Sequence, residues 1–158
     1  MATQSSIHSE NNNNKKTRIL LVDDEYDVAT SLKVLLENEC YGEEKQDTNN
    51  TTSKSRSKEF EVDIFNDPEL ALSNFKSGRF DLLLLDIVMP KMDGFELYEK
   101  MKNIDNNVRV CFITAYDINY HAIRDLFPMT AEVDCFLRKP IGQQELKNRI
   151  REELKRSL

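Results

Sequence analysis

Four apolar segments, each ending in a polar side chain, constrain the fold of this chain more than any other feature. Three of them are uninterrupted runs, and the fourth is shorter. Runs without polar alternation are typical of strands buried on both faces of a parallel sheet. Open parallel sheets bind ligands beyond the carboxyl ends of their strands, so we expect the polar ends to meet in one crevice. The ends are Asp23 with Asp24, Asp86, Thr114 and Lys139, after runs that begin at Arg18, Asp81, Arg109 and Cys135.

The remaining pattern predicts strands and helices in alternation. Residues 60–65 alternate apolar and acidic side chains, as a half-exposed edge strand does. Apolar residues at helical spacing predict the helices, and Asn66 or Asp67 can cap the second of them. Five strands alternating with five helices predict an α/β fold with a doubly wound, five-stranded parallel sheet. The expected strands are 17–22, 60–65, 80–86, 109–114 and 135–137, and the expected helices are 26–39, 68–77, 95–102, 119–127 and 143 onward.

Two polar stretches interrupt this pattern. Residues 1–16 contain too few apolar side chains to offset the entropy of ordering, so we expect a disordered tail. Residues 41–58 are again polar and end in basic residues. We expect a loop inserted into a domain that spans 17–158, and a partner-binding insert is the open alternative.

Length and charge limit the function. A chain of 158 residues fits one domain and leaves little room for a separate output domain. A net charge of -6, with no massed basic segment, argues against direct binding to nucleic acid. No apolar stretch approaches the roughly 20 residues that cross a bilayer, and residues 1–16 lack the apolar centre of a signal peptide. We therefore expect a cytoplasmic protein without a membrane attachment.

The cysteines are odd in number. Cys111 and Cys135 lie inside apolar runs, and Cys40 follows the first predicted helix. We expect them to be small buried hydrophobic residues rather than part of a disulfide or a metal cluster.

Taken singly, each polar strand end has an ordinary structural explanation. Asp23 and Asp24 are placed to cap the following helix and favour its positive end. Asp86 resembles a solvated loop aspartate, Thr114 a β-branched strand residue, and Lys139 a surface lysine before a turn proline. The expected convergence of four strand ends is what favours a common site.

The sequence around these ends resembles the receiver domain of two-component response regulators. The resemblance runs from about Lys16 to Ser157 and is interrupted by the loop after the first helix. The matching pieces, in order, are LLVDDE at 20–25, LLDIVMPKMDG at 84–94, ITA at 113–115 and FLRKP at 136–140. It implies a flavodoxin-like receiver sandwich of the stand-alone type.

The resemblance also implies a role for each residue. Asp86 would accept the phosphoryl group, and Asp23, Asp24, Asp86 and the backbone carbonyl of Val88 would bind Mg²⁺. Thr114 would contact the phosphoryl group, Lys139 would pair with it, and Phe136 would be the rotating switch aromatic. The chemistry agrees, because three crowded carboxylates repel one another and a hard divalent cation relieves that repulsion.

Other classes fit less well. An aspartyl-phosphate phosphatase needs a second acid two residues after the nucleophile, where this chain has Val88. A phosphate-binding NTPase needs a glycine-rich loop, whereas the glycines here are isolated. His8 and His121 are poorly placed for a histidine-centred site. A receiver-like module that is never phosphorylated is the serious rival, but it usually lacks the acceptor or the acid pair.

We therefore expect a phosphorylation-dependent signalling switch rather than an enzyme, apart from its own phosphotransfer and autodephosphorylation. Its partners would be a histidine kinase or a histidine phosphotransfer protein and a downstream protein target. The alternatives are a phosphorelay intermediate and the unphosphorylated module. We expect a monomer or a phosphorylation-dependent dimer. The output face would comprise the helix with Tyr120, His121 and Arg124, the strand around Phe136, and the last helix around Gln144 and Lys147.

Overall fold

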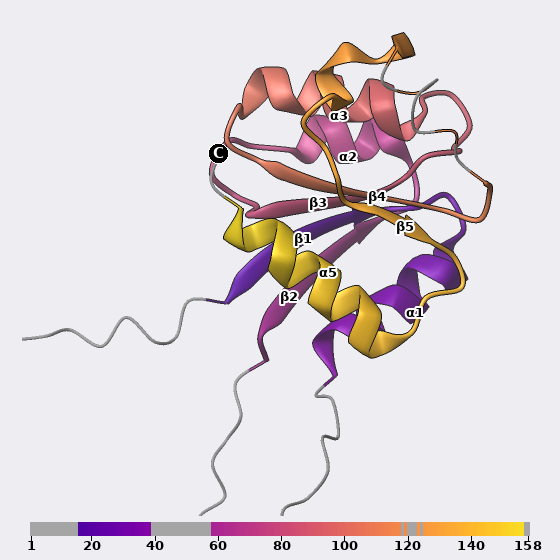
Figure 1. Cartoon of the computed structure of the whole chain (residues 1–158). Helices are drawn as coiled ribbons and strands as arrows, with labels where there is room; N and C mark the ends of the chain where they lie inside the picture. The colour runs from indigo at the N-terminus through magenta and orange to yellow at the C-terminus, as the bar shows by residue number, and fades with distance from the viewer. Residues whose placement is uncertain (1–15, 39–57, 118, 120–122, 124, 157–158) are drawn as a thin grey trace, which may run out of the picture.

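A computed structural model describes residues 16–38, 58–117, 119, 123 and 125–156. Within these residues, five parallel strands form one sheet in the order β2-β1-β3-β4-β5 (Figure 1). This order confirms the predicted doubly wound parallel sheet and places β2 at an edge. The strands are β1 (Thr17–Val22), β2 (Phe60–Phe65), β3 (Leu82–Asp86), β4 (Arg109–Thr114) and β5 (Phe136–Arg138).

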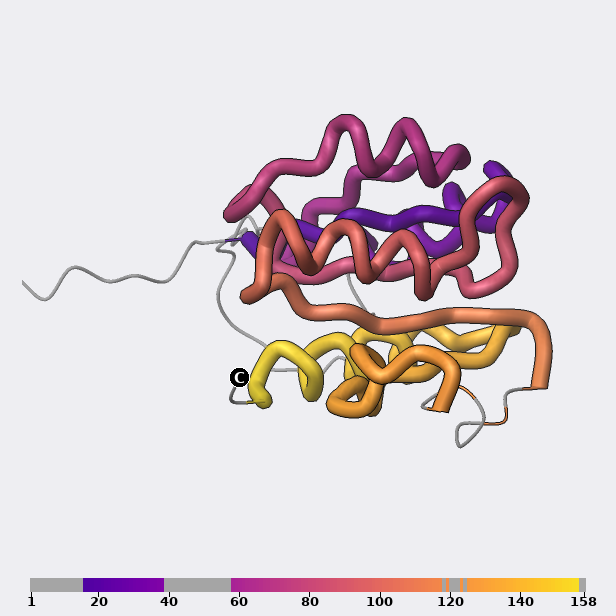
Figure 2. The backbone as a smooth tube through the Cα atoms, turned by 90° about the horizontal axis from the view of Figure 1, so that it is seen from above, coloured from indigo at the N-terminus to yellow at the C-terminus, as the bar shows by residue number. Residues whose placement is uncertain are grey.

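Helices cover both faces of the sheet. Helices α2 and α3 lie on one face and α1 and α5 on the other (Figure 1). Seen from above, α2 and α3 lie side by side and run roughly along the strand direction (Figure 2). The helices are α1 (Tyr26–Glu37), α2 (Pro68–Asn74), α3 (Gly94–Ile104) and α5 (Gln143–Lys155), with a 3-10 turn at Pro128–Thr130.

The central strands are buried on both faces, as their uninterrupted apolar sequences predict. Successive strand residues point to opposite faces, so Leu83 and Leu85 join the core under α2 and α3, while Leu82 and Leu84 join the core under α1 and α5. All of β3 is buried, including its last residue, Asp86. The apolar strands thus form two cores and carry polar residues to the carboxyl edge.

Several boundaries differ from the predicted ones. Strand β3 begins at Leu82 rather than at residue 80, because the Phe80 ring packs beside Phe75 and the Asp81 carboxylate accepts a hydrogen bond from the Arg18 amide. Helix α2 ends at Asn74, before Gly78, because Phe75 takes an extended backbone. Asp67, one of the two expected caps, accepts hydrogen bonds from the amides of residues 69 and 70.

Parts of other predictions fall on residues that the structure does not describe. The expected tail and insertion lie outside the described residues, except for Lys16 and Lys58. Of the helix expected at 119–127, Ile123, Asp125 and Leu126 are helical, and Tyr120, His121 and Arg124 lie outside the described residues. Among the helices of the described ranges, none is long and apolar enough to cross a membrane.

The expectation that the cysteines form no disulfide was wrong for two of them. Cys111 and Cys135 are buried, as expected, but they are joined by a disulfide. The parallel pairing of β4 with β5 sets Phe112 opposite Phe136, so the two preceding cysteines are neighbours on one face of the sheet. Their separation of 24 residues gave no sign of that register. Cys40 lies outside the described residues.

Candidate functional site

Three carboxylates gather at the carboxyl edge of the sheet. Asp23 follows β1 and Asp86 ends β3, and both are buried because neighbouring strands flank them. Asp24 is exposed at the rim. One oxygen from each of the three lies within 4.8 Å of the others. The predicted convergence of the two acidic strand ends is therefore confirmed.

Backbone amides hold two of these carboxylates in place. One Asp23 oxygen accepts a hydrogen bond from the Glu25 amide at 3.0 Å, and one Asp86 oxygen accepts a weaker one from the Val88 amide at 3.3 Å. The N-cap residue of α1 is Glu25, so Asp23 and Asp24 do not cap this helix. The capping role considered for that pair is therefore wrong.

Lys139 supplies the positive charge of the site. Its backbone amide donates to the Thr114 carbonyl at 2.8 Å, which fixes the residue after β5 beside the end of β4. Its ammonium lies 2.6 Å from Asp23 Oδ2 and 2.7 Å from Asp86 Oδ2. Burial lowers the pKa of Lys139, but the hydrogen bonds and charges of the two aspartates outweigh burial, so the pKa is raised and the ammonium stays charged.

At Asp23, in contrast to Lys139, burial determines the direction of the pKa shift. It raises the pKa of this carboxyl above the ordinary aspartate value, and the nearby Asp86 charge adds to that effect, although Lys139 opposes it. Three carboxylates and one ammonium leave two negative charges without a counter-charge. A divalent cation with a preference for oxygen ligands matches both that charge and the donor set.

Thr114 lies next to this acidic cluster, and Phe136 lies further back along the sheet, at the beginning of β5. Thr114 is buried one residue beyond Ile113, the β4 partner of Asp86, and its hydroxyl accepts a hydrogen bond from the Tyr116 amide at 3.2 Å. The Phe136 ring is partly buried and stacks on Phe112 at 5.4 Å between centroids. Thr114 thus lies at the carboxyl edge, whereas Phe136 lies two residues before Arg138, the β5 partner of Thr114.

Gly94 is a positioning residue that the sequence reasoning missed. A Cβ atom at this position would lie 2.2 Å from the Asp86 carbonyl oxygen, far inside contact distance. The Gly94 amide also donates to the Ile87 carbonyl at 3.0 Å. The start of α3 can therefore pack against the backbone of Asp86 only if residue 94 has no side chain. In the sequence, the Asp93-Gly94 pair indicated a turn but not the close approach of α3 to the Asp86 backbone.

We expect Gly94→Ala to displace the Asp86 backbone and to lower the free energy of unfolding by about 1 to 3 kcal/mol, as overpacking does. Gly142→Ser is the control, because nothing lies within 4 Å of a Cβ there and because serine is favoured at the N-cap position that Gly142 occupies in α5. Urea denaturation of both variants measures the difference. Equal stability of the two variants would contradict the close approach at Gly94.

Comparison with protein families decides the family to which this fold belongs. The family model described as the response regulator receiver domain matches residues 43–151, more than half of the chain. The chain belongs to the response regulator receiver family. The matched range of this receiver includes Asp86, Thr114 and Lys139, whereas Asp23 and Asp24 lie before it.

Curated relatives of this receiver are response regulators. It is 29% identical over 140 residues to the transcriptional regulatory protein TrcR of Mycobacterium tuberculosis, an alignment that covers 89% of this chain and 46% of TrcR. It is 28% identical over 130 residues to the response regulator SaeR of Staphylococcus epidermidis, which covers 82% of this chain and 47% of SaeR. The chain spans about half the length of these relatives.

Solved receiver structures agree with the observed fold. A CheY-like receiver domain protein from Methanospirillum hungatei is 27% identical, with a TM-score of 0.66 over 89% of this chain and 94% of that one. The response regulator TrrA from Thermotoga maritima, solved in complex with Mg²⁺ and BeF, is 29% identical. Its TM-score is 0.62, over 86% of this chain and 97% of TrrA.

Proposed function

We propose that this receiver is a phosphorylation-dependent switch that accepts a phosphoryl group on Asp86 from a histidine kinase or a histidine phosphotransfer protein. The observation that carries the proposal is the position of the Asp86 carboxylate, 2.7 Å from the Lys139 ammonium and within 4.8 Å of two further carboxylates. Phosphoryl transfer needs positioning and charge neutralisation more than covalent help, and these residues supply both.

In the proposed transfer, a carboxylate oxygen of Asp86 attacks phosphorus. The bond from phosphorus to the donor imidazole breaks, and the imidazole nitrogen keeps the electron pair. Lys139 is placed to neutralise charge on the phosphoryl oxygens. Asp23, Asp24 and Asp86 would hold Mg²⁺, with the Val88 carbonyl as a further ligand. Bound Mg²⁺ would neutralise phosphoryl charge.

The direct test is incubation with acetyl phosphate and Mg²⁺, followed by measurement of the intact mass. We expect one added phosphoryl group that is stable in acid and labile in base, as an acyl phosphate is. Removal of Mg²⁺ by a chelator should suppress the gain. A protein that gains no phosphoryl group, or gains it equally without a divalent cation, would contradict the proposed mechanism.

The side chains that flank the acceptor predict a long-lived phosphorylated state. Val88 and Tyr116 are 50% and 65% exposed at the mouth of the site, in the positions that flank the approach of water in receivers. Valine has no group that orients water, and tyrosine offers one hydroxyl. Replacing Val88 with Asn and Tyr116 with Glu together should speed loss of phosphate about tenfold, which is about 1.4 kcal/mol in the barrier.

Phosphate release after removal of the donor measures this decay. Ile104→Asn is the control, because Ile104 is comparably exposed at 47% and ends α3. Decay that is unchanged or slower in the double variant would reject this account of the lifetime.

Signal output would follow from Thr114 and Phe136. Movement of the Thr114 hydroxyl toward the phosphoryl group would free space beside β4, into which the Phe136 ring could turn. The expected output face needs one correction. Lys147 is buried and its ammonium donates to the Asn38 carbonyl after α1, so only Gln144 of that pair is exposed. A protein target would bind around Phe136 and Gln144.

The location, domain bounds and oligomeric state of the receiver are part of the same proposal. We place the receiver in the cytoplasm as a domain of residues 17–158, acting without direct contact with nucleic acid or a membrane and as a monomer or a phosphorylation-dependent dimer. Passing the phosphoryl group on to a histidine phosphotransfer protein is the alternative. Transfer from the phosphorylated receiver to such a protein, faster than hydrolysis, would favour the relay.

A further inference from the structure

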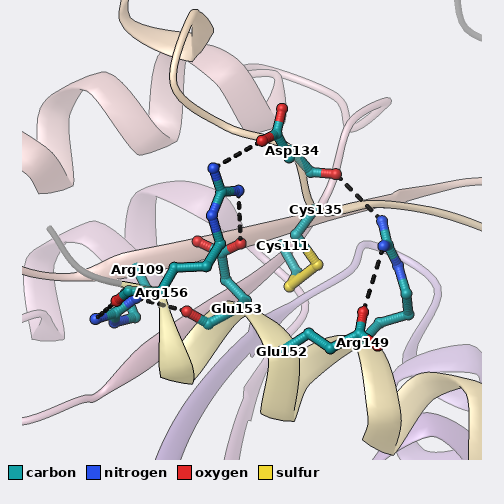
Figure 3. Close-up of a disulfide and its surroundings, with 8 residues drawn as sticks. All are labelled: Arg109, Cys111, Asp134, Cys135, Arg149, Glu152, Glu153 and Arg156. Atoms are coloured by element: carbon teal, nitrogen blue, oxygen red, sulfur yellow. Dashed lines mark hydrogen bonds and ion pairs between the residues drawn. A yellow bond between two sulfur atoms is a disulfide. The ribbon is translucent and has the colours of Figure 1, made fainter.

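We propose that Cys111 and Cys135 form a reversible dithiol–disulfide site that small thiols reach through a cavity beside Cys135. The disulfide joins β4 to the residue before β5 on the face of the sheet under α5 (Figure 3). It lies away from the acidic cluster, which occupies the carboxyl edge. The cysteines are therefore not needed for phosphoryl transfer, and their chemistry is a separate property.

The sheet itself brings the two cysteines together. Neighbouring strands lie about 4.7 to 4.9 Å apart, and the Cα atoms of Cys111 and Cys135 are 4.6 Å apart. The Phe112 amide donates to the Cys135 carbonyl at 2.8 Å, so strand pairing fixes this spacing independently of the sulfur atoms. Both the dithiol and the disulfide can therefore form within one backbone arrangement.

Both cysteines are buried, and only Cys135 borders a cavity among the described residues. A cavity of about 300 Å³ is lined by Cys135 but not by Cys111. Its other lining residues are charged residues of α5, of its C-cap and of the loop before β5: Arg149, Glu152, Glu153, Arg156 and Asp134 (Figure 3). Arg149 donates to the Asp134 carbonyl at 3.1 Å, and Arg156 pairs with the Asp134 carboxylate at 2.7 Å. Both contacts are exposed to solvent, so they yield to a small molecule more easily than the apolar core does.

A small dithiol reduces the disulfide in two steps. A thiolate of a small dithiol attacks the Cys135 sulfur, the bond to the Cys111 sulfur breaks, and Cys111 leaves as a thiolate that takes up a proton. The second thiol of the reductant then displaces Cys135. Two electrons and two protons pass to the protein, and the dithiol becomes a disulfide. Glutathione disulfide closes the pair again. The Cys135 thiolate displaces one glutathione to form a mixed disulfide, Cys111 then displaces the second glutathione, and the two electrons pass to the two glutathione thiols released.

Reversibility is also expected from the compartment, and this step rests on the cytoplasmic location in the proposed function. Disulfides in reducing compartments are usually transient and redox-sensing. The bond lies one residue before Phe136 and three before Thr114 along their strands. Its closure therefore adds a covalent link between the two strands that carry the proposed switch.

The first test uses the full chain with Cys40→Ser, so that only the pair can react. The oxidised protein is treated with dithiothreitol without denaturant, free thiols are alkylated, and the intact mass is measured. We expect no alkylation before treatment, two alkylated cysteines after it, and closure again with glutathione disulfide. Reduction only in denaturant would overturn the proposal, as would thiols that never close. No phosphodonor is present, so failure of Asp86 phosphorylation leaves this result unchanged.

A second test compares the two single cysteines, each with Cys40→Ser. The Cys111→Ser protein keeps Cys135 beside the cavity and should form a mixed disulfide with glutathione disulfide. The Cys135→Ser protein keeps only Cys111, and its rate of reaction should be at most about one tenth of that of the Cys111→Ser protein, because the reactivity of a cysteine follows its access to solvent. Circular dichroism confirms folding of both variants. Equal rates in folded proteins, or faster reaction of Cys111, would overturn the proposed route.

Discussion

Protein carrying Asp86→Asn should gain no phosphoryl group from acetyl phosphate and Mg²⁺, under conditions in which the unchanged protein gains one. An amide keeps the size of the carboxylate but lacks the charged oxygen that attacks phosphorus. The neutral side chain should also fit beside Lys139, so the fold should be retained. Intact mass after a fixed incubation measures the loss.

Asp63→Asn is the matched control for this loss. Asp63 is also a strand aspartate paired with a cation, since its carboxylate lies 3.0 Å from Arg79, but it is in the edge strand β2 and partly exposed. We expect normal phosphorylation of this variant. Equal labelling of the Asp86→Asn protein and the control would show that Asp86 is not the acceptor.

Lys139→Ala should have the largest effect on stability in the absence of metal. The change leaves the buried Asp23 and Asp86 carboxylates without their common partner, and breaking a buried ion pair on one side costs about 3 kcal/mol. Mg²⁺ should recover much of this loss, since a ligand at 100 times its Kd adds about 2.7 kcal/mol. Urea denaturation at neutral pH, with and without Mg²⁺, measures both effects.

The loss should also shrink as the pH falls. The pKa of Asp23 is raised by burial in the folded protein although Lys139 opposes that shift. Removal of Lys139 therefore raises the pKa further, and the folded variant binds the proton more tightly than the unchanged protein does. Lowering the pH from neutral through that raised pKa, toward the ordinary value of 3.8, therefore favours folding at this residue. Lys100→Ala is the control, because Lys100 forms an exposed pair with Glu96. A Lys139→Ala protein as stable as this control, or one that Mg²⁺ does not stabilise, would contradict the account of the site.

The sequence predicted the arrangement of the strands well, because that arrangement follows from local patterns. Uninterrupted apolar runs marked the buried strands, and their polar ends marked the edge at which Asp23, Asp86 and Lys139 meet. Parallel pairing of the strands then fixed the positions of the acidic residues at that edge. The resemblance to receivers added the role of each residue, which strand patterns alone do not contain.

Features set by contacts between distant segments were less predictable. The Cys111–Cys135 disulfide depends on the pairing register of β4 with β5. The requirement for glycine at Gly94 depends on the approach of α3 to the Asp86 backbone. Lys147 seemed suited to the surface by its charge, but its position on α5 directs its ammonium to the end of α1. None of these contacts leaves a pattern within one segment.

Locating the phosphoryl group in the unchanged protein tests the central claim most directly. Borohydride reduces an acyl phosphate of aspartate to homoserine, and peptide mass spectrometry identifies the converted residue. After treatment with acetyl phosphate and Mg²⁺, we predict homoserine at position 86 and unconverted aspartate at positions 23 and 24. Conversion at Asp23 or Asp24, or at no aspartate in protein that has gained a phosphoryl group, would contradict the assignment of Asp86 as the acceptor.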